Sequence, residues 1–107
     1  MSWTVTLSRD AQKDYDRLDK TQQTLVLKSL DKLAQNPLPV YQGGYGKPLG
    51  NKRALKLAGY YKVKIRKAGI RIVYELRCVK ENVFVIVIGM RDSDAVYRTA
   101  LERIQKG

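Results

Sequence analysis

The chain has 107 residues, of which 21 are Lys or Arg and 10 are Asp or Glu, with no histidine and a single cysteine. This length suits one domain, residues 1–107. The absence of histidine removes both the usual general base and the commonest zinc ligand, so we expect no metal or other cofactor. One cysteine cannot form an intramolecular disulfide, and the longest apolar run, residues 83–88, is far shorter than the about 20 residues of a membrane span, so we expect a cytoplasmic protein without a membrane partner.

The first 36 residues predict a short strand followed by two helices. Residues 3–7 alternate between apolar side chains and threonines, as in a half-buried strand. Ser8 is suited to cap the first helix, and Asp19 with Gln22 has the spacing of a capping box that begins the second. The Asn-Pro pair at 36–37 should end that helix. The expected apolar stripes of the two helices are Ala11, Tyr15, Leu18, Val26, Leu30, Leu33 and Ala34.

Residues 37 to about 57 are rich in Pro, Gly and Lys and predict an irregular loop, after which a β-hairpin follows. The segments 60–66 and 70–76 each alternate between apolar and polar residues, as half-buried strands do. The polar face of this hairpin carries four cations, Lys62, Lys64, Arg66 and Arg71.

We expect a tight hairpin turn at Ala68-Gly69, because a three-residue loop would split both faces of the hairpin. This turn gives the cross-strand pairs Arg66–Arg71, Lys64–Val73 and Lys62–Glu75. Glu75 would then pair with Lys62 and leave Lys64 as the freer amine.

The charge of the chain is concentrated in this region. Residues 37–80 carry eleven Lys and Arg against one acid, whereas residues 81–107 are balanced. Like charges gathered on an exposed sheet face cost stability unless an anion binds there, so this face predicts contact with a polyanion, most simply a nucleic-acid backbone. The alternative is a basic face that is merely solvated, and the regular alternation of the cations weakens it.

The last third of the chain predicts a central strand and a final helix. Residues 83–88 are apolar on both faces, as in a strand covered on both sides. Asp92 or Ser93 is suited to cap the final helix, whose apolar positions are Val96, Ala100 or Leu101, and Ile104. The expected fold is α+β in the order βααβββα, with two N-terminal helices and a C-terminal helix packed on one side of a small antiparallel sheet.

Four short motifs follow one another in the second half of the chain: K-x-K at 62–64, R-x-V-Y at 71–74, G-x-R at 89–91 and V-Y at 96–97. Each is weak alone. In this order, and with the expected succession of elements, they resemble the RelE group of the RelE/ParE toxin superfamily over essentially the whole chain. The resemblance implies a RelE-like fold and a toxin that cuts messenger RNA in the ribosomal A site and so inhibits translation.

The resemblance also implies site residues and partners. Mapped by motif, the catalytic set is Lys62, Lys64, Arg71, Arg91 and Tyr97, a set without histidine. The implied partners are the ribosome with its messenger RNA and a cognate RelB-like antitoxin. The complex with the antitoxin is further expected to bind operator DNA.

RNA cleavage without a metal requires the 2′-OH to attack the adjacent phosphate while the 5′-oxygen leaves. Lys64 is our choice of base, since like-charged neighbours favour its neutral form. Arg71 and Lys62 suit the equatorial phosphate oxygens. Arg91 would stabilise or protonate the leaving oxygen, and Tyr97 would stack on a base or share the acid–base work. We expect both Arg91 and Tyr97 to reach the RNA face as exposed side chains.

A second group of cations is expected to bind RNA or the ribosome: Lys47, Lys52, Arg53, Lys56, Arg66 and Lys67. Acidic residues of the antitoxin would complement the same region.

Two alternative functions remain open. A ParE-like inhibitor of DNA gyrase fits the expected fold equally well but has no need of the catalytic set. An RNA-binding module without catalysis predicts aromatic residues among the cations, where the basic face offers little beyond Tyr60.

Overall fold

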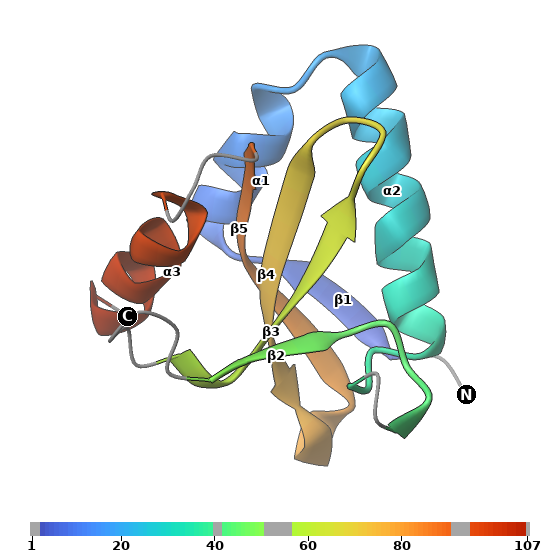
Figure 1. Cartoon of the computed structure of the whole chain (residues 1–107), viewed down its shortest axis with the longest axis vertical. Coiled ribbons are helices and arrows are strands. Elements are labelled where there is room, and N and C mark those ends of the chain that lie inside the picture. Colours follow the sequence, from blue (N-terminus) through green and yellow to red (C-terminus); the bar gives the residue numbers. More distant parts are fainter. Residues whose placement is uncertain (1–2, 40–41, 51–56, 91–94, 107) are drawn as a thin grey trace.

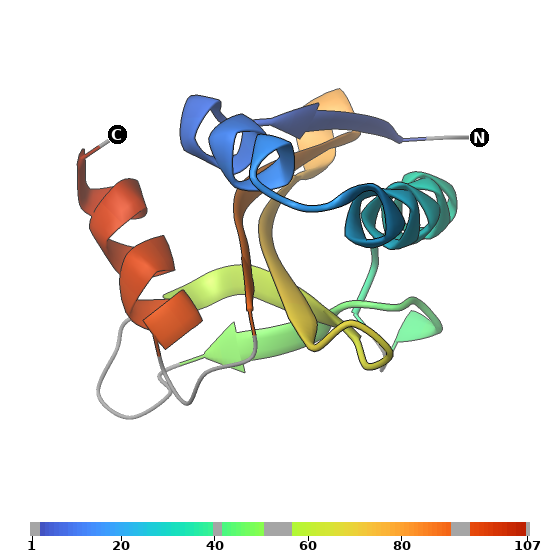
Figure 2. The ribbon, with the colours of Figure 1, turned by 90° about the horizontal axis from the view of Figure 1, so that it is seen from above.

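Five strands form one sheet that lies between helices on its two faces (Figures 1 and 2). The computed structural model describes residues 3–39, 42–50, 57–90 and 95–106. In chain order its elements are β1 (Thr4–Leu7), α1 (Arg9–Asp16), α2 (Lys20–Gln35), β2 (Lys47–Gly50), β3 (Leu57–Ile65), β4 (Ile70–Arg77), the 3-10 turn η3 (Cys78–Lys80), β5 (Asn82–Met90) and α3 (Ala95–Lys106). No helix in these described ranges is long and apolar enough to cross a lipid bilayer.

The two N-terminal helices begin and end where the sequence predicts. The Ser8 hydroxyl accepts a hydrogen bond from the Ala11 amide at 3.1 Å and caps α1. Asp19 and Gln22 form a reciprocal capping box at the start of α2, with side-chain to backbone distances of 2.8 and 3.1 Å. The helix ends at its C-cap Asn36, directly before the proline. These local signals are confirmed because they depend only on neighbouring residues.

A first hydrophobic core lies between α1, α2 and the sheet. Ala11, Val26, Leu30 and Leu33 are buried there, and the partly buried Tyr15 and Leu18 pack against them. The strands contribute a second set of apolar side chains to this core, Ile65, Ile70, Ile72, Tyr74, Val83, Val85 and Ile88.

The predicted central strand, β5, is central in the structure and is covered on both faces. Its neighbours are β1 and β4 in the strand order β1-β5-β4-β3-β2. Val83 and Val85 face the first core, whereas Ile86 and Val87 face a second core beneath α3. Two adjacent residues share that face because a β-bulge leaves Ile86 without a partner on β4. The prediction that all helices pack on one side is therefore wrong, since a strand that is apolar on both faces requires cover on both.

The sheet is mixed rather than antiparallel. Strand β1 pairs with β5 in parallel, from Thr4 opposite Asn82 to Leu7 opposite Val85. The alternation of residues 3–7 fixes which side chains face the core but carries no information on strand direction, so the antiparallel prediction is wrong at this edge.

The predicted loop of residues 37–57 contains an additional strand. Strand β2 pairs antiparallel with β3, placing Lys47 opposite Lys62 and Pro48 opposite Tyr61. Four residues that include Pro and Gly have little intrinsic strand preference, and Pro is tolerated because β2 is an edge strand. The observed order is accordingly βααββββα.

The β3–β4 hairpin has a wider turn than predicted. Its last cross-strand pair is Ile65–Ile70, and residues 66–69 form the turn, closed by a 3.3 Å bond from the Ala68 amide to the Ile65 carbonyl. A two-residue hairpin turn at 68–69 would favour a positive φ at Ala68, whereas the observed turn places only Gly69 there, at φ 64°.

The wider turn shifts the pairing by two residues, which keeps both faces but changes every partner. Lys64 now lies opposite Arg71, Lys62 opposite Val73, and Tyr60 opposite Glu75. The predicted Lys62–Glu75 pair is therefore wrong, and the Glu75 carboxylate instead binds Arg77 at 2.6 Å.

A buried hydrogen bond ties the segment after α2 to the sheet. The Tyr74 hydroxyl is fully buried and donates to the Pro37 carbonyl at 2.8 Å. Gly46 lies against the same hydroxyl, where any larger side chain would collide with it. Burial raises the pKa of Tyr74 above its ordinary value near 10.

We expect Tyr74→Phe to lower the free energy of unfolding by about 1–3 kcal/mol, because the Pro37 carbonyl loses its partner inside the protein. The matched control is Tyr45→Phe at an exposed side chain, which should change it by no more than about 0.5 kcal/mol. Urea unfolding curves measure both. Equal effects of the two substitutions would contradict the structural role of this bond.

The raised pKa also predicts alkaline sensitivity. Above pH about 10 the unfolded chain loses the Tyr74 proton while the folded protein retains it, so the free energy of unfolding falls as pH rises. Tyr74→Phe should show a shallower fall than the parent between pH about 9 and 11, with Tyr45→Phe carried through the same series. Parallel curves for all three proteins would rule out this contribution.

Candidate active site

Three of the predicted catalytic residues meet at one phenol oxygen. The Tyr97 hydroxyl accepts a hydrogen bond from Lys62 Nζ at 3.0 Å and from Arg71 Nη1 at 2.9 Å. Both cations also lie over the Tyr97 ring, at 5.2 and 5.7 Å from its centroid. Tyr97 is 0% exposed and Lys62 is 8% exposed, so both residues lie inside the protein, whereas Arg71 is half-buried. We call Lys62, Arg71 and Tyr97 the tyrosine cluster.

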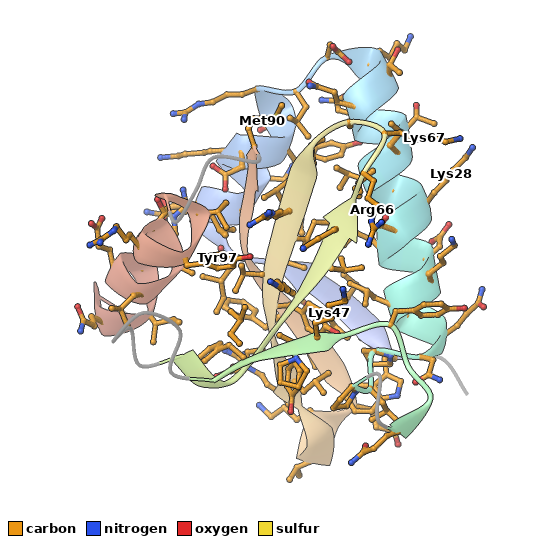
Figure 3. All side chains as sticks on the ribbon, in the orientation of Figure 1. Lys28, Lys47, Arg66, Lys67, Met90 and Tyr97 are labelled. Carbon is orange, nitrogen blue, oxygen red and sulfur yellow. The ribbon has the colours of Figure 1, made fainter. Side chains whose placement is uncertain are left out.

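The strands and α3 bring these residues together from three elements. Lys62 on β3 and Arg71 on β4 point to the face that α3 covers, and Tyr97 lies in the first turns of α3. Figure 3 shows Tyr97 reaching from α3 toward the strands. Gly89 of β5 allows this approach, because a side chain there would strike Val96 of the helix. The G-x-R motif thus begins with a residue that the packing of α3 requires to be small.

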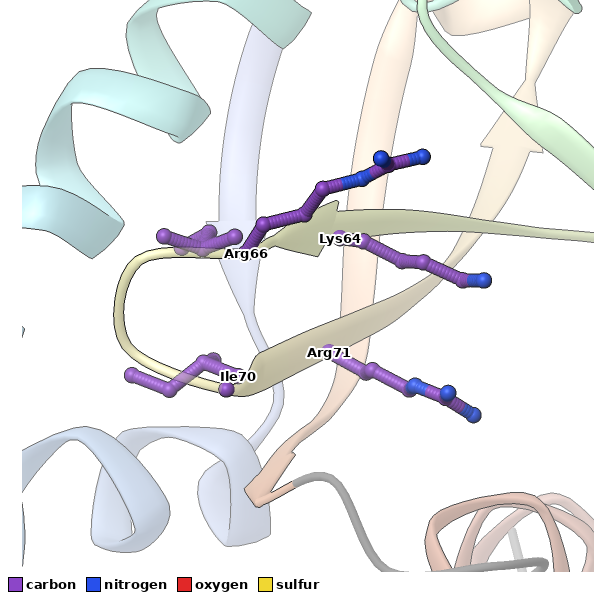
Figure 4. Close-up of a pocket in the computed structure, with 6 residues that line it drawn as sticks. Lys64, Arg66, Ile70 and Arg71 are labelled. Atoms are coloured by element: carbon purple, nitrogen blue, oxygen red, sulfur yellow. The ribbon is translucent and has the colours of Figure 1, made fainter.

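A hollow of about 220 Å³ opens beside the tyrosine cluster at the end of the hairpin. Its basic lining consists of Lys64, Arg66 and Arg71, whose side chains extend in one direction while Ile70 points away (Figure 4). Lys64 and Arg66 are exposed, and Arg71 is half-buried. We call this hollow the basic pocket. Because Arg71 lines it and also binds Tyr97, the pocket and the cluster share a residue.

The basic pocket has the chemistry of an anion site. Lys64 of β3, Arg71 of β4 and Arg66 of the turn line it, and Arg71 lies directly opposite Lys64 in the ladder. Guanidinium groups suit the paired oxygens of a phosphate, and a lysine ammonium adds a compact positive charge. In the described ranges of the chain no three His, Cys, Asp or Glu side chains gather in a way that could hold a metal ion.

The structure corrects the predicted exposure of two site residues. Tyr97 and Lys62 were both expected on an open RNA face, and both are buried because α3 packs over that face. Tyr97 therefore cannot stack on an RNA base in this conformation, and its ring is part of the second core. Replacing it by Ala would cost folding stability as well as any activity.

The remaining predicted cations divide into two groups. Lys47 on β2 and Lys67 in the hairpin turn are exposed, like Arg66 (Figure 3). The others, together with the proposed helix caps Asp92 and Ser93, lie outside the described residues: Lys52, Arg53, Lys56 and Arg91. Sequence reasoning missed two further residues, Asp14 and Arg103, which join α1 to α3. No local motif marks this pair, since its members are 89 positions apart.

The chain matches known proteins along most of its length. Residues 5–95 match the family described as the ParE toxin of the type II toxin–antitoxin system parDE. The mRNA interferase toxin RelE of Escherichia coli is 30% identical over 107 residues, covering 97% of this chain and 99% of that protein.

Solved structures of RelE share the fold. A free double mutant of Escherichia coli RelE superimposes with a TM-score of 0.75 and 28% identity, covering 97% of this chain and 99% of that one. The RelBE toxin–antitoxin complex of the same organism matches with a TM-score of 0.64 and 25% identity, over 85% of this chain and 99% of that one. The predicted α+β, RelE-like fold is confirmed by these matches, and the chain is a type II toxin that belongs to the RelE/ParE superfamily.

Proposed function

We propose that this protein is a ribosome-dependent endoribonuclease that cleaves messenger RNA in the A site and so inhibits translation. The observation that carries the proposal is the basic pocket, in which Lys64 and Arg71 face each other beside the tyrosine cluster. The similarity of the whole chain to an mRNA interferase supports the same activity. A cytoplasmic place of action follows from this proposal.

The proposed reaction needs no metal. The neutral amine of Lys64 takes the proton of the 2′-OH, whose oxygen attacks the adjacent phosphorus. The bond to the 5′-oxygen breaks, leaving a 2′,3′-cyclic phosphate and a 5′-oxygen that takes a proton from water to become a hydroxyl. Cations around the pocket stabilise the additional charge on the phosphorane.

The other residues have distinct proposed roles. Arg71 binds the equatorial oxygens of the phosphate, because its guanidinium borders the pocket. Lys62 is too deeply buried for the direct phosphate contact predicted from the sequence, so we assign it to holding the Tyr97 hydroxyl. Tyr97 in turn holds Arg71 in place. Arg91 is proposed to stabilise the leaving oxygen, as the family motif implies.

Dependence on the ribosome has a physical reason in this proposal. The basic pocket offers charge but little enclosure, and its described lining contains no aromatic platform for a base. Positioning by the ribosome would supply the missing orientation, which is worth several kcal/mol in favourable cases. The exposed cations Lys47, Arg66 and Lys67 are proposed to contact RNA or the ribosome, as are Lys52, Arg53 and Lys56.

We further propose a RelB-like antitoxin as partner. The Escherichia coli relative is solved as a RelBE toxin–antitoxin complex. Acidic residues of such a partner would complement the eleven cations of residues 37–80 and accelerate association at low salt. Binding of operator DNA by the complex is part of the same proposal.

One specific observation favours a second function, inhibition of DNA gyrase. The family that matches residues 5–95 is named for ParE toxins.

The two functions differ in the nucleic acid that is damaged when the protein is induced in cells. The first function predicts discrete messenger RNA ends inside translated codons, and the second predicts broken DNA. We expect the RNA ends. Broken DNA with intact messages would overturn the proposal and establish the alternative.

Within the first function, Lys64→Gln should lower single-turnover cleavage on programmed ribosomes by about 10²–10⁴-fold, the usual contribution of a general base. Its exposure predicts a change in unfolding free energy within about 0.5 kcal/mol. The matched control is Lys28→Gln, the same change at an exposed site on α2 that does not line the basic pocket. If Lys64→Gln cleaves like Lys28→Gln, Lys64 is not the base.

A further inference from the structure

One end of β5 extends beyond its neighbour β1. Strand β1 ends at Leu7, opposite Val85, whereas β5 continues to Met90. Side chains from two helices bind the backbone of this extension. The Ile86 carbonyl accepts from the Ser8 hydroxyl at 3.3 Å and from Arg103 Nη1 at 2.9 Å, and the Ile88 amide donates to Asp14 Oδ2 at 3.1 Å.

Arg103 connects the helices on the two faces of the sheet around this extension. From α3 it donates to both carboxylate oxygens of Asp14 on α1, with Nη1 at 2.7 Å and Nη2 at 3.1 Å. Asp10 lies 3.8 Å from its Nε. The side chains of Arg103 and Asp14 are only 20% and 11% exposed. Such a bidentate, partly buried pair is geometrically specific, unlike a solvated surface ion pair.

Hollows border α3 on the flanks that the second core does not fill. Arg103 lines two hollows beside the helix, of about 420 and about 270 Å³. Tyr97 and Arg103 lie six positions apart, about 9 Å along the helix axis and about 120° around it. A helix held at two points on different flanks cannot roll about its axis, so the ion pair fixes the direction in which Tyr97 points.

We propose that Arg103, held by Asp14, is a positioning residue for the proposed cleavage reaction: it sets the rotation of α3 that places the Tyr97 hydroxyl against Lys62 and Arg71. The inference rests on the proposed function. Arg103 does not line the basic pocket, so its effect on the reaction passes through Tyr97.

A double-mutant cycle tests this coupling. Single-turnover cleavage on programmed ribosomes is measured at saturating protein for Arg103→Gln in the parent and in a Tyr97→Phe background. Because a misplacement of about 1 Å can cost about 10²-fold, we expect a loss of about 10- to 100-fold in the parent. In the Tyr97→Phe background, where the hydroxyl is already absent, we expect less than about 3-fold. Arg98→Gln, the same change at an exposed site on α3, should have no effect in either background.

A purely structural role predicts equal losses in both backgrounds, and that result overturns the proposal, as does an unchanged rate. If Arg103→Gln does not fold, Asp14→Asn replaces it, because the amide oxygen can still accept from Ile88. If the parent itself fails to cleave, the proposed function fails separately. Whether Arg103 sets the position of Tyr97 is then decided by fluorine NMR with 3-fluorotyrosine at position 97. The fluorine signal should shift with Arg103→Gln and not with Arg98→Gln.

Discussion

The candidate site depends on a pair of cations that share one buried phenol oxygen. A buried ammonium group is costly unless it is hydrogen-bonded, and the Tyr97 hydroxyl provides a partner for Lys62 at 3.0 Å. The same oxygen accepts from Arg71, so two like charges on neighbouring strands are held close together. Their mutual repulsion is offset by α3, which supplies both the oxygen and the ring beneath them. The placement of these two charges on the hairpin therefore depends on the packing of α3 against the sheet.

This constraint explains the division of the sheet into two faces. The face toward α1 and α2 is wholly apolar in its core, whereas the face beneath α3 is apolar near β5 and becomes basic toward the hairpin turn. The bulge at Ile86 turns two adjacent apolar residues of β5 toward α3, which anchors the helix on this side. The helix thus covers the apolar part of the face, its Tyr97 covers Lys62, and the cations at the end of the hairpin stay exposed.

Local features of this arrangement could be predicted from the sequence, and features set by distant contacts could not. The caps at Ser8 and Asp19 depend on neighbours within four positions, and strand alternation correctly separated the two faces of the hairpin. The cross-strand pairing was wrong by two residues because alternation is unchanged by such a shift. The burial of Lys62 by Tyr97 was missed because alternation shows on which face of the sheet a side chain lies but does not show which helix covers that face.

The parallel pairing of β1 with β5 bears on how a newly made chain acquires its structure. Asn82 binds the backbone of Thr4 across 78 positions, and α3 follows β5 in the chain. Contacts of such long sequence separation close late and slow the search for the native state. A nascent chain of this protein consequently holds its basic hairpin without the helix that organises it until α3 has also been synthesised. The site therefore forms only after α3 has been made, and a product that stops before α3 lacks Tyr97 altogether.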